Sequence, residues 1–525
     1  MNLSPLHPNR RSFLKSAGVL TAGSLLVGFE IPLMGRPRLP AAASGLMADA
    51  FIRIDPSNTI TLMMNHAEFG NGVYTSLAMM VAEELDFNWQ TLKWEAAPTE
   101  ARYFSPIFGE YLTAGSVSTA GALKPMREAG AKTRQLLLTA ASRLWEAEIE
   151  SLSTSAGQIH HADGRTVLYG DLIDTIRNHD LKPPKSVQLK APSEFKILGR
   201  PQRRLEGPEK VTGEAQFGID VRRPGMIYGA VLRPPVYGSH VKTFDPEAAL
   251  KIPGVIKVKA IDAGVVVLAK DYWTATKGVK VLRVDWDDNG LGDLSTARFT
   301  EEYRALSRQS GLQAEDIGDA AKTIQAAETR LESVYEMPYL AHATMEPMNC
   351  TAQVSPDHCE IWVGTQYQSN DRTIVARLLG LPEEQVIIHR TLMGGTFGRR
   401  ASKTADFVTD AVQAAQGESV PVQIIWSREE DMRGGHYRPL FVHRLRGSLN
   451  DEGYPEAWHQ TVVGQSIMQN TKHDPAYLVR GIDIYSVDGC LQEPFGVFPY
   501  GTSYQIPNHR VESHNPPKVG VRPHE

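Results

Sequence analysis

The chain has 525 residues, with 55 Lys and Arg against 60 Asp and Glu, so its formal net charge is −5. Hydrophobic residues make up 42% and charged residues 22%, which are globular values and exclude a disordered or fibrous chain. The lack of a basic excess disfavours nucleic acid as a partner. Three cysteines, none in a C-x-x-C pair, exclude a disulfide-dense fold and argue against an Fe–S cluster held by this chain.

The N-terminus has the pattern of an export signal. Arg10 and Arg11 stand in an R-R-x-F-L-K pattern, an apolar run follows over 17–29, and the alanines at 41–43 offer a cleavage site. The apolar run is shorter than the ~20 residues of a transmembrane helix. Because the pattern resembles a twin-arginine signal, we expect removal of residues 1–43 and a periplasmic protein, with membrane association left open. The alternative is an uncleaved N-terminal anchor.

Proline- and charge-rich stretches divide the remaining chain into segments over 48–182, 200–290 and 315–525. In the first segment, apolar spacing predicts short strands near 52–54 and 60–62 and a helix over 75–85 that begins at Thr75 or Ser76. A longer helix carries an apolar stripe over 137–145. The pair Glu83-Glu84 is predicted to lie on a solvated helix face.

The second and third segments alternate strand and helix patterns. A fully apolar run at 264–269 predicts a buried strand, followed by a short helix over 271–277 and a half-buried strand over 282–286. The third segment places a strand at 386–388, a glycine-rich loop at 393–400, a helix over 407–415 and a strand at 422–426. The expected fold class is therefore mixed α/β (α+β) with several subdomains.

The loop at 393–400 is the clearest local candidate for ligand binding. A glycine-rich strand-to-helix loop lets backbone N–H groups approach an anion, and Arg399 and Arg400 could add charge toward a phosphate. The alternative is a tight turn with surface arginines. The loop matches neither the dinucleotide-binding nor the P-loop pattern, and no metal-ligand spacing of histidines is seen. Glu346, in an apolar loop, needs a partner or a role.

Several blocks, each weak alone, form an ordered set. They are Glu68–Thr75 (EFGNGVYT), Thr113–Ser118 (TAGSVS), Lys210–Phe217 (KVTGEAQF), Trp362–Gln366 (WVGTQ) and Gly394–Arg400 (GGTFGRR). This set resembles the molybdopterin-binding subunit of the xanthine dehydrogenase/aldehyde oxidase family, and within it the isoquinoline 1-oxidoreductase beta subunit. The resemblance runs from about residue 49 to 507.

The resemblance implies roles for single residues. Gln366 and Phe397 would face the molybdenum. The cofactor itself would be held by three loops, at Gly70, Asn71 and Gly72, at Gly115, Ser116 and Ser118, and at Gly394, Gly395, Thr396, Gly398 and Arg399. No side chain would ligate the metal, because the cofactor's dithiolene holds it. The segment 200–290 would be an α/β hammerhead domain inserted in the molybdopterin-binding fold.

The sequence departs from the family pattern at several points. Asn71 replaces the usual Gln, and Thr396 replaces a Gly, where a β-branched residue resists positive φ. The Glu68–Thr75 block precedes the hammerhead region, the rearranged order of the isoquinoline branch. After Asn508 the chain barely resembles the family, and the segment with the general-base glutamate is expected to be missing. Glu525 is not assigned that role.

The resemblance implies an enzyme that hydroxylates N-heteroaromatic carbons or oxidises aldehydes, with water as the oxygen source. The expected cofactor is molybdopterin cytosine dinucleotide. A small [2Fe–2S] subunit is the expected electron-transfer partner, with a cytochrome as a candidate acceptor beyond it. The alternative is a catalytically inactive, truncated relative that serves as a binding or scaffold protein. The sequence leaves the substrate, the acceptor and the oligomeric state open.

Overall fold

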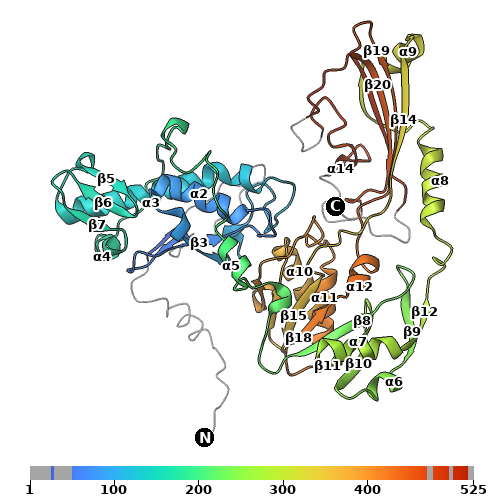
Figure 1. Cartoon of the computed structure of the whole chain (residues 1–525), viewed down its shortest axis with the longest axis horizontal. Helices are drawn as coiled ribbons and strands as arrows, with labels where there is room; N and C mark the ends of the chain where they lie inside the picture. Colours follow the sequence, from blue (N-terminus) through green and yellow to red (C-terminus); the bar gives the residue numbers. More distant parts are fainter. Residues whose placement is uncertain (1–24, 29–49, 470–476, 496–500, 518–525) are drawn as a thin grey trace. The chain divides into compact units, whose positions relative to one another are not determined.

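The computed structural model describes residues 25–28, 50–469, 477–495 and 501–517. Its fold is mixed α/β, which confirms the predicted fold class. The chain forms two compact units (Figure 1). Unit 1 comprises residues up to Val221 together with Glu360–Met393, and unit 2 comprises Arg222–Cys359 together with Gly394–Glu525. The boundaries of the three predicted segments stay a prediction.

Unit 1 is built on a four-stranded sheet of order β1-β2-β3-β4. Its strands are β1 (Leu25–Gly28), β2 (Ala50–Ile54), β3 (Ile60–Met64) and β4 (Lys93–Ala96). The first pairs are antiparallel, and β3 and β4 run parallel. Ile52, Ile54 and Ile60 are fully buried, as alternation in a strand predicts. β1 falls inside the predicted export signal, whose other residues lie outside the described part of the chain.

Two helices, α2 (Val73–Leu85) and α3 (Ser118–Trp145), pack side by side in the core of unit 1 (Figure 1). α2 begins two residues earlier than predicted, with Gly72 rather than Thr75 or Ser76 as its N-cap. The Thr75 hydroxyl is used otherwise, because it accepts from the N–H of Leu205 at 2.9 Å and donates to Glu206 at 3.0 Å.

The other elements of unit 1 are short. The strands and helices are β5 (Leu152–Ser155), β6 (Gln158–His161), β7 (Thr166–Leu168), α4 (Ile173–Asn178), α5 (Gly207–Thr212), β16 (Cys359–Val363), α10 (Gln368–Leu379) and β17 (Val386–Arg390). Single 3-10 turns are η1 (Trp89–Thr91), η2 (Ala101–Tyr103), η3 (Ile149–Ser151), η4 (Gly170–Leu172), η5 (Pro192–Glu194), η6 (Gly218–Asp220) and η7 (Glu383–Gln385).

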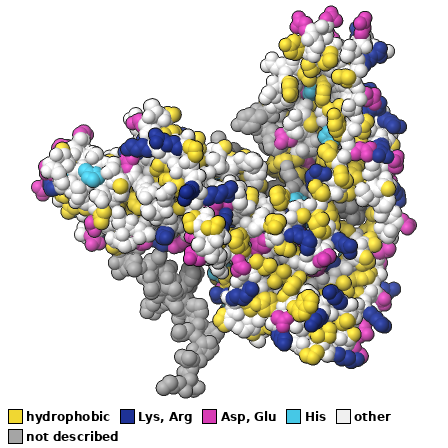
Figure 2. Space-filling model, in the orientation of Figure 1, with side chains coloured by type: hydrophobic (Ala, Val, Ile, Leu, Met, Phe, Trp, Pro, Cys, Tyr) yellow, Lys and Arg dark blue, Asp and Glu magenta, His cyan; other side chains and the backbone are white. Residues whose placement is uncertain are grey.

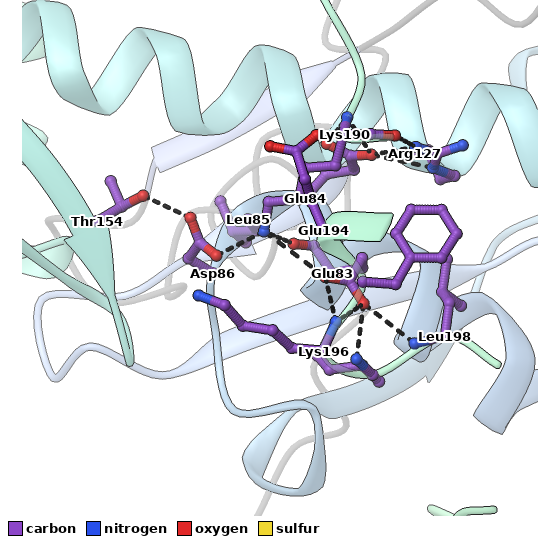
Figure 3. Close-up of polar contacts among 12 residues, drawn as sticks. Glu83, Glu84, Leu85, Asp86, Arg127, Thr154, Lys190, Glu194, Lys196 and Leu198 are labelled. Carbon is purple, nitrogen blue, oxygen red and sulfur yellow. Dashed lines mark hydrogen bonds and ion pairs between the residues drawn. The ribbon is translucent and has the colours of Figure 1, made fainter. Parts of the chain in front are cut away.

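The prediction that Glu83 and Glu84 lie on a solvated face is wrong, since both side chains are at most 1% exposed. Figure 3 shows the polar contacts that they make instead. Glu84 pairs with Arg127 at 2.7 Å and accepts from the N–H of Lys190 at 3.2 Å. The Glu83 carboxylate accepts from the three N–H groups of residues 196–198 at 2.7–3.1 Å. Helical spacing failed here because a segment distant in sequence covers this face of α2.

Five strands of unit 2 are hydrogen-bonded to one another in the order β10-β11-β8-β18-β15. Its elements here are β8 (Ile227–Leu232), β9 (His240–Asp245), α6 (Glu247–Leu250), β10 (Val255–Ile261), β11 (Gly264–Ala269), α7 (Tyr272–Val281), β12 (Arg283–Asp287), β15 (Asn349–Val354), α11 (Asp406–Ala415), β18 (Val422–Ile425) and α12 (Arg428–Arg433). All six residues of β11 are buried, as predicted. Asp271 caps α7 by accepting from the N–H of Thr274 at 2.7 Å. α11 packs against β15 and β18.

A second sheet of unit 2 has the order β13-β23-β20-β19-β14. The elements around it are α8 (Thr296–Leu306), β13 (Leu312–Ile317), α9 (Ala320–Ala326), β14 (Arg330–Met337), β19 (Phe441–Leu449), β20 (Pro455–Gly464), β21 (Leu478–Val479), β22 (Ile482–Asp483), α14 (Ile484–Val487) and β23 (Asn508–His514). β20 and β23 run parallel, and their neighbours are antiparallel. One face buries Val462, Ile484 and Val511.

On the face of the molecule in Figure 2, basic side chains are interspersed with acidic ones over both units. Neither unit presents a broad basic surface on this face. Among the described residues, Cys350, Cys359 and Cys490 form no disulfide. Within the described ranges, the helices are too short or too polar to cross a membrane.

Candidate functional site

The turn before α2 is the first of the predicted cofactor segments. Gly70 and Gly72 have φ of +100° and +76°, a region that favours glycine. Between them, the exposed Asn71 accepts weakly from the N–H groups of Phe69 and Val73 at 3.5 Å each. Inside the turn lies the buried carboxylate of Glu68, which accepts from the N–H of Gly70 at 2.8 Å. Sequence reasoning gave Glu68 no role of its own.

The loop before α3 is the second segment. Gly115 and Ser116 have φ of +63° and +54° and are exposed, and Ser118 begins the helix. A serine with positive φ is strained backbone, which concentrates at functional sites. Both segments therefore place a left-handed turn at the start of a helix in unit 1.

Thr113 joins these two segments to Gln366. Its N–H donates to the carbonyl oxygen of Gln366 at 2.9 Å, and its own carbonyl accepts from the Gln366 Nε2 at 2.8 Å. Its hydroxyl oxygen accepts from the N–H of Ala67, just before the first turn, at 2.9 Å. The structure thus brings three predicted segments of unit 1 together, and Thr113 is the link that sequence reasoning did not single out.

The amide of Gln366 is held in one orientation. Rotating it by half a turn would set Oε1 against the Thr113 carbonyl oxygen, so Nε2 stays the donor there. The side chain is 3% exposed, and its Oε1 has no hydrogen-bond partner among the described residues. A buried amide oxygen without a donor is costly. A bound group with an N–H or O–H would satisfy it, so this part of unit 1 fits a ligand that carries a hydrogen-bond donor.

The glycine-rich loop over Gly394–Arg400 lies in unit 2. A side chain at Gly394 would come within 2.5 Å of the Cβ of Glu346, so this close approach requires glycine. Positive φ falls on Gly395, Phe397 and Gly398 and not on Thr396, whose β-branched side chain is buried. Phe397 is 72% exposed despite its φ of +50°. The loop therefore presents an aromatic ring outward on strained backbone.

Arg399 and Arg400 are not surface arginines, so that alternative is wrong. Both are at most 2% exposed. Arg399 pairs with Asp406 at 2.6 Å, and Arg400 pairs with Glu346 at 3.1 Å. Burial raises the pKa of Asp406, but the neighbouring Arg399 and then His436 outweigh it and hold that pKa far below its usual range. The guanidinium groups are thus committed to internal carboxylates, and a phosphate role for Arg399 stays a prediction.

Glu346 has the charged and hydrogen-bonding partners that a carboxylate in an apolar loop needs. Besides Arg400, its carboxylate accepts from the N–H of Gly394 at 2.7 Å and from the amide of Asn349 at 2.9 Å. No group of His, Cys, Asp or Glu within the described ranges could hold a metal ion.

Comparison with known proteins identifies two matches to models of a molybdopterin cofactor-binding domain, over residues 22–220 and 306–481. The chain is 26% identical to the isoquinoline 1-oxidoreductase beta subunit of Brevundimonas diminuta, over 91% of the chain and 68% of that protein. It is 30% identical to a membrane-bound aldehyde dehydrogenase (pyrroloquinoline-quinone) of Gluconacetobacter polyoxogenes, over 88% and 62%. A nicotinate dehydrogenase subunit of Pseudomonas putida is 28% identical, over 87% and 38%.

The chain therefore spans between 38% and 68% of the length of these relatives. Among solved structures, quinoline 2-oxidoreductase of Pseudomonas putida 86 matches with a TM-score of 0.45 and 17% identity, covering 59% of this chain and 43% of that one. The two domain models and the long alignments agree with the order of the motifs. The chain belongs to the molybdopterin-binding subunits of the xanthine dehydrogenase family, together with the isoquinoline 1-oxidoreductase beta subunit.

Proposed function

We propose that this chain is the molybdenum-cofactor part of an exported oxidoreductase that hydroxylates N-heteroaromatic carbons or oxidises aldehydes. The observation that carries the proposal is Gln366, a buried amide with an unsatisfied oxygen, held beside two left-handed turns of unit 1. The relatives include isoquinoline, nicotinate and aldehyde enzymes, which supports this substrate class.

When bound, the cofactor supplies two-electron oxidation of a substrate carbon, with water as the oxygen source. Gln366 would orient it, and Gly115, Ser116 and Ser118 would hold it from the second turn. In unit 2, Phe397 offers an apolar face for an aromatic substrate. Glu68 and Glu346 are both engaged in ion pairs, so neither is assigned as general base.

Further parts of the proposal follow from the motifs. The cofactor would be the cytosine dinucleotide form, and electrons would leave through a small [2Fe–2S] subunit. The twin-arginine pattern at Arg10 and Arg11 supports export to the periplasm. Changing both arginines to lysine should retain the chain in the cytoplasm, as measured by cell fractionation.

The test is to purify the chain from its host with its co-purifying subunits. We expect molybdenum by mass spectrometry, CMP after acid hydrolysis, and dye-linked oxidation of quinoline or an aldehyde, with label from H₂¹⁸O in the product. Gln366→Ala should lower turnover about 100-fold or more, whereas Gln368→Ala, a buried glutamine two residues on, serves as control. Protein that retains no molybdenum would instead support the inactive binding protein.

A further inference from the structure

The Glu68 carboxylate occupies the position that an anion bound by the Gly70–Gly72 turn would take. Its side chain is fully buried, and its Oε1 accepts from the N–H groups of Gly70 at 2.8 Å and Gly72 at 3.4 Å. Its Oε2 accepts from the N–H of Tyr74 at 3.4 Å, in the first turn of α2. Converging N–H groups at a helix start favour a negative charge, and here the chain supplies that charge itself.

Two cations complete the surroundings of Glu68. Lys210 lies 3.3 Å from its Oε1 and Arg204 lies 3.6 Å away. The same two cations pair with the buried Glu206 at 3.3 and 3.5 Å. Burial raises the pKa of Glu206, but a backbone hydrogen bond and then Lys210 outweigh it and hold the pKa below its usual value. The four charges therefore form a closed ring.

The cations come from the connector over 190–210, which is fixed to α2 along its length. Near the end of α2, Glu83 and Glu84 hold its backbone N–H groups (Figure 3). Near the start of α2, Thr75 accepts from the N–H of Leu205. The connector therefore delivers Arg204 and Lys210 to the turn in a defined position.

The two carboxylates and the two cations differ in exposure. Glu68 and Glu206 are fully buried, whereas the side chains of Arg204 and Lys210 are 47% and 24% exposed. The Arg204 guanidinium carbon lies 3.5 Å from the position that a Cβ on Gly72 would take. The two cations thus reach the surface beside the turn, whereas the N–H groups of Gly70 and Gly72 donate to the buried Glu68.

We propose that Glu68 is the resident anion of the Gly70–Gly72 turn, a positioning residue that holds the turn closed, and that Arg204 is the group beside it that meets an anionic ligand. An N–H that binds Glu68 cannot also bind a phosphate. The cofactor contact that the family resemblance gives to Gly70 and Gly72 therefore moves to Arg204. This last step rests on the proposed function, because the ligand class is the phosphate of the cofactor.

The test of Glu68 uses the full chain without cofactor. Glu68→Ala should lower the midpoint of thermal unfolding of unit 1 by about 5 °C, because three N–H groups lose their acceptor and two cations lose one of their two carboxylates. Sodium formate should restore part of that loss by binding where the carboxylate was. Formamide, of the same size but neutral, should restore none, and wild type should gain nothing from either. Equal effects of formate and formamide, or an unchanged midpoint, would overturn the proposal.

Glu68→Gln covers the case in which the alanine variant does not fold. The amide keeps the shape of the side chain but weakens its hold on N–H groups and cations. Hydrogen exchange at Gly70, Gly72 and Tyr74 should rise at least about tenfold, while exchange in the middle of α2 stays unchanged. Unaltered exchange at the turn would contradict a holding role for Glu68.

Arg204 is tested in two backgrounds. Added to Glu68→Ala, Arg204→Gln should reduce the gain in stability that formate gives. If formate restores as much stability with this change as without it, Arg204 does not contact the bound anion. In the otherwise wild-type chain, Arg204→Gln should lower the molybdenum retained after gel filtration, whereas Arg200→Gln, on the same connector, should not. Formate rescue in a protein that never carries molybdenum would leave the role of Glu68 standing while the proposed function fails.

Discussion

The glycine turns of the two units share one arrangement but differ in how exposed the paired cation is. In each, a buried carboxylate accepts from a glycine N–H, Glu68 from Gly70 at 2.8 Å in unit 1 and Glu346 from Gly394 at 2.7 Å in unit 2. In unit 2 the paired cation, Arg400, is fully buried, whereas in unit 1 Arg204 is half exposed. The same arrangement therefore buries the paired cation in unit 2 and leaves it accessible in unit 1.

The largest expected effect is in unit 2. Arg400→Met should cost about 3–5 kcal/mol of its free energy of unfolding, because Glu346 would stay buried without its cation. Chemical denaturation followed by circular dichroism measures the loss, and adding Glu346→Gln should recover part of it. Arg433→Met, exposed in the same unit, is the control. If Arg400→Met and Arg433→Met lowered the free energy of unfolding by equally small amounts, the contrast drawn between the two units would be wrong.

A pH effect is expected in unit 1. Burial, and then the charge of Arg390, lower the pKa of His66 to about 4, against about 6.5 in an unfolded chain. The unfolded state therefore takes up the proton first, and stability falls by about 3 kcal/mol as the pH drops from about 6.5 to about 4. His66→Gln should flatten this part of the stability profile. His179→Gln, at an exposed position, should leave it as in wild type.

A smaller effect is expected at the connector. Glu83→Gln should cost about 1–3 kcal/mol and expose residues 190–198 to trypsin, because three N–H groups lose a charged acceptor. Burial raises the pKa of Glu83, but the N–H groups of Leu198, Ile197 and Lys196 outweigh it and keep the pKa below its usual value. This stability is present above the unfolded pKa of about 4.3 and is lost at lower pH. Tryptic cleavage no faster than in Glu148→Gln would refute a role for Glu83 in fixing the connector.

The smallest effect is expected at Asn71. It is exposed and makes only long contacts, so Asn71→Gln should change the free energy of unfolding by less than about 0.5 kcal/mol. Thermal unfolding checks this value. A loss as large as that of Glu68→Ala would mean that the Asn71 side chain, and not Glu68, holds the turn.

The local sequence pattern was sufficient to predict an element wherever its burial follows from its own residues. β11 lies where the apolar run at 264–269 predicted it, and α11 and β18 follow the predicted helix and strand with shifts at their ends. Period and composition are local properties. The ordered motifs likewise indicated the family, and they assigned Gln366 and the segment at 113–118 to one cofactor. In the structure, Thr113 joins the two.

The mixed α/β class, the elements with clear apolar spacing and the family could thus be predicted from the sequence, whereas the set of buried charges follows from tertiary packing. Glu83, Glu84, Arg399 and Arg400 have the local pattern of surface residues, yet all are buried. The free energy of a buried charge depends on its partner, and these partners lie as far away as residues 196–198 for Glu83 and Glu346 for Arg400. No local spacing encodes such a partner, so neither the ring of charges around Glu68 nor the attachment of the connector to α2 could be predicted.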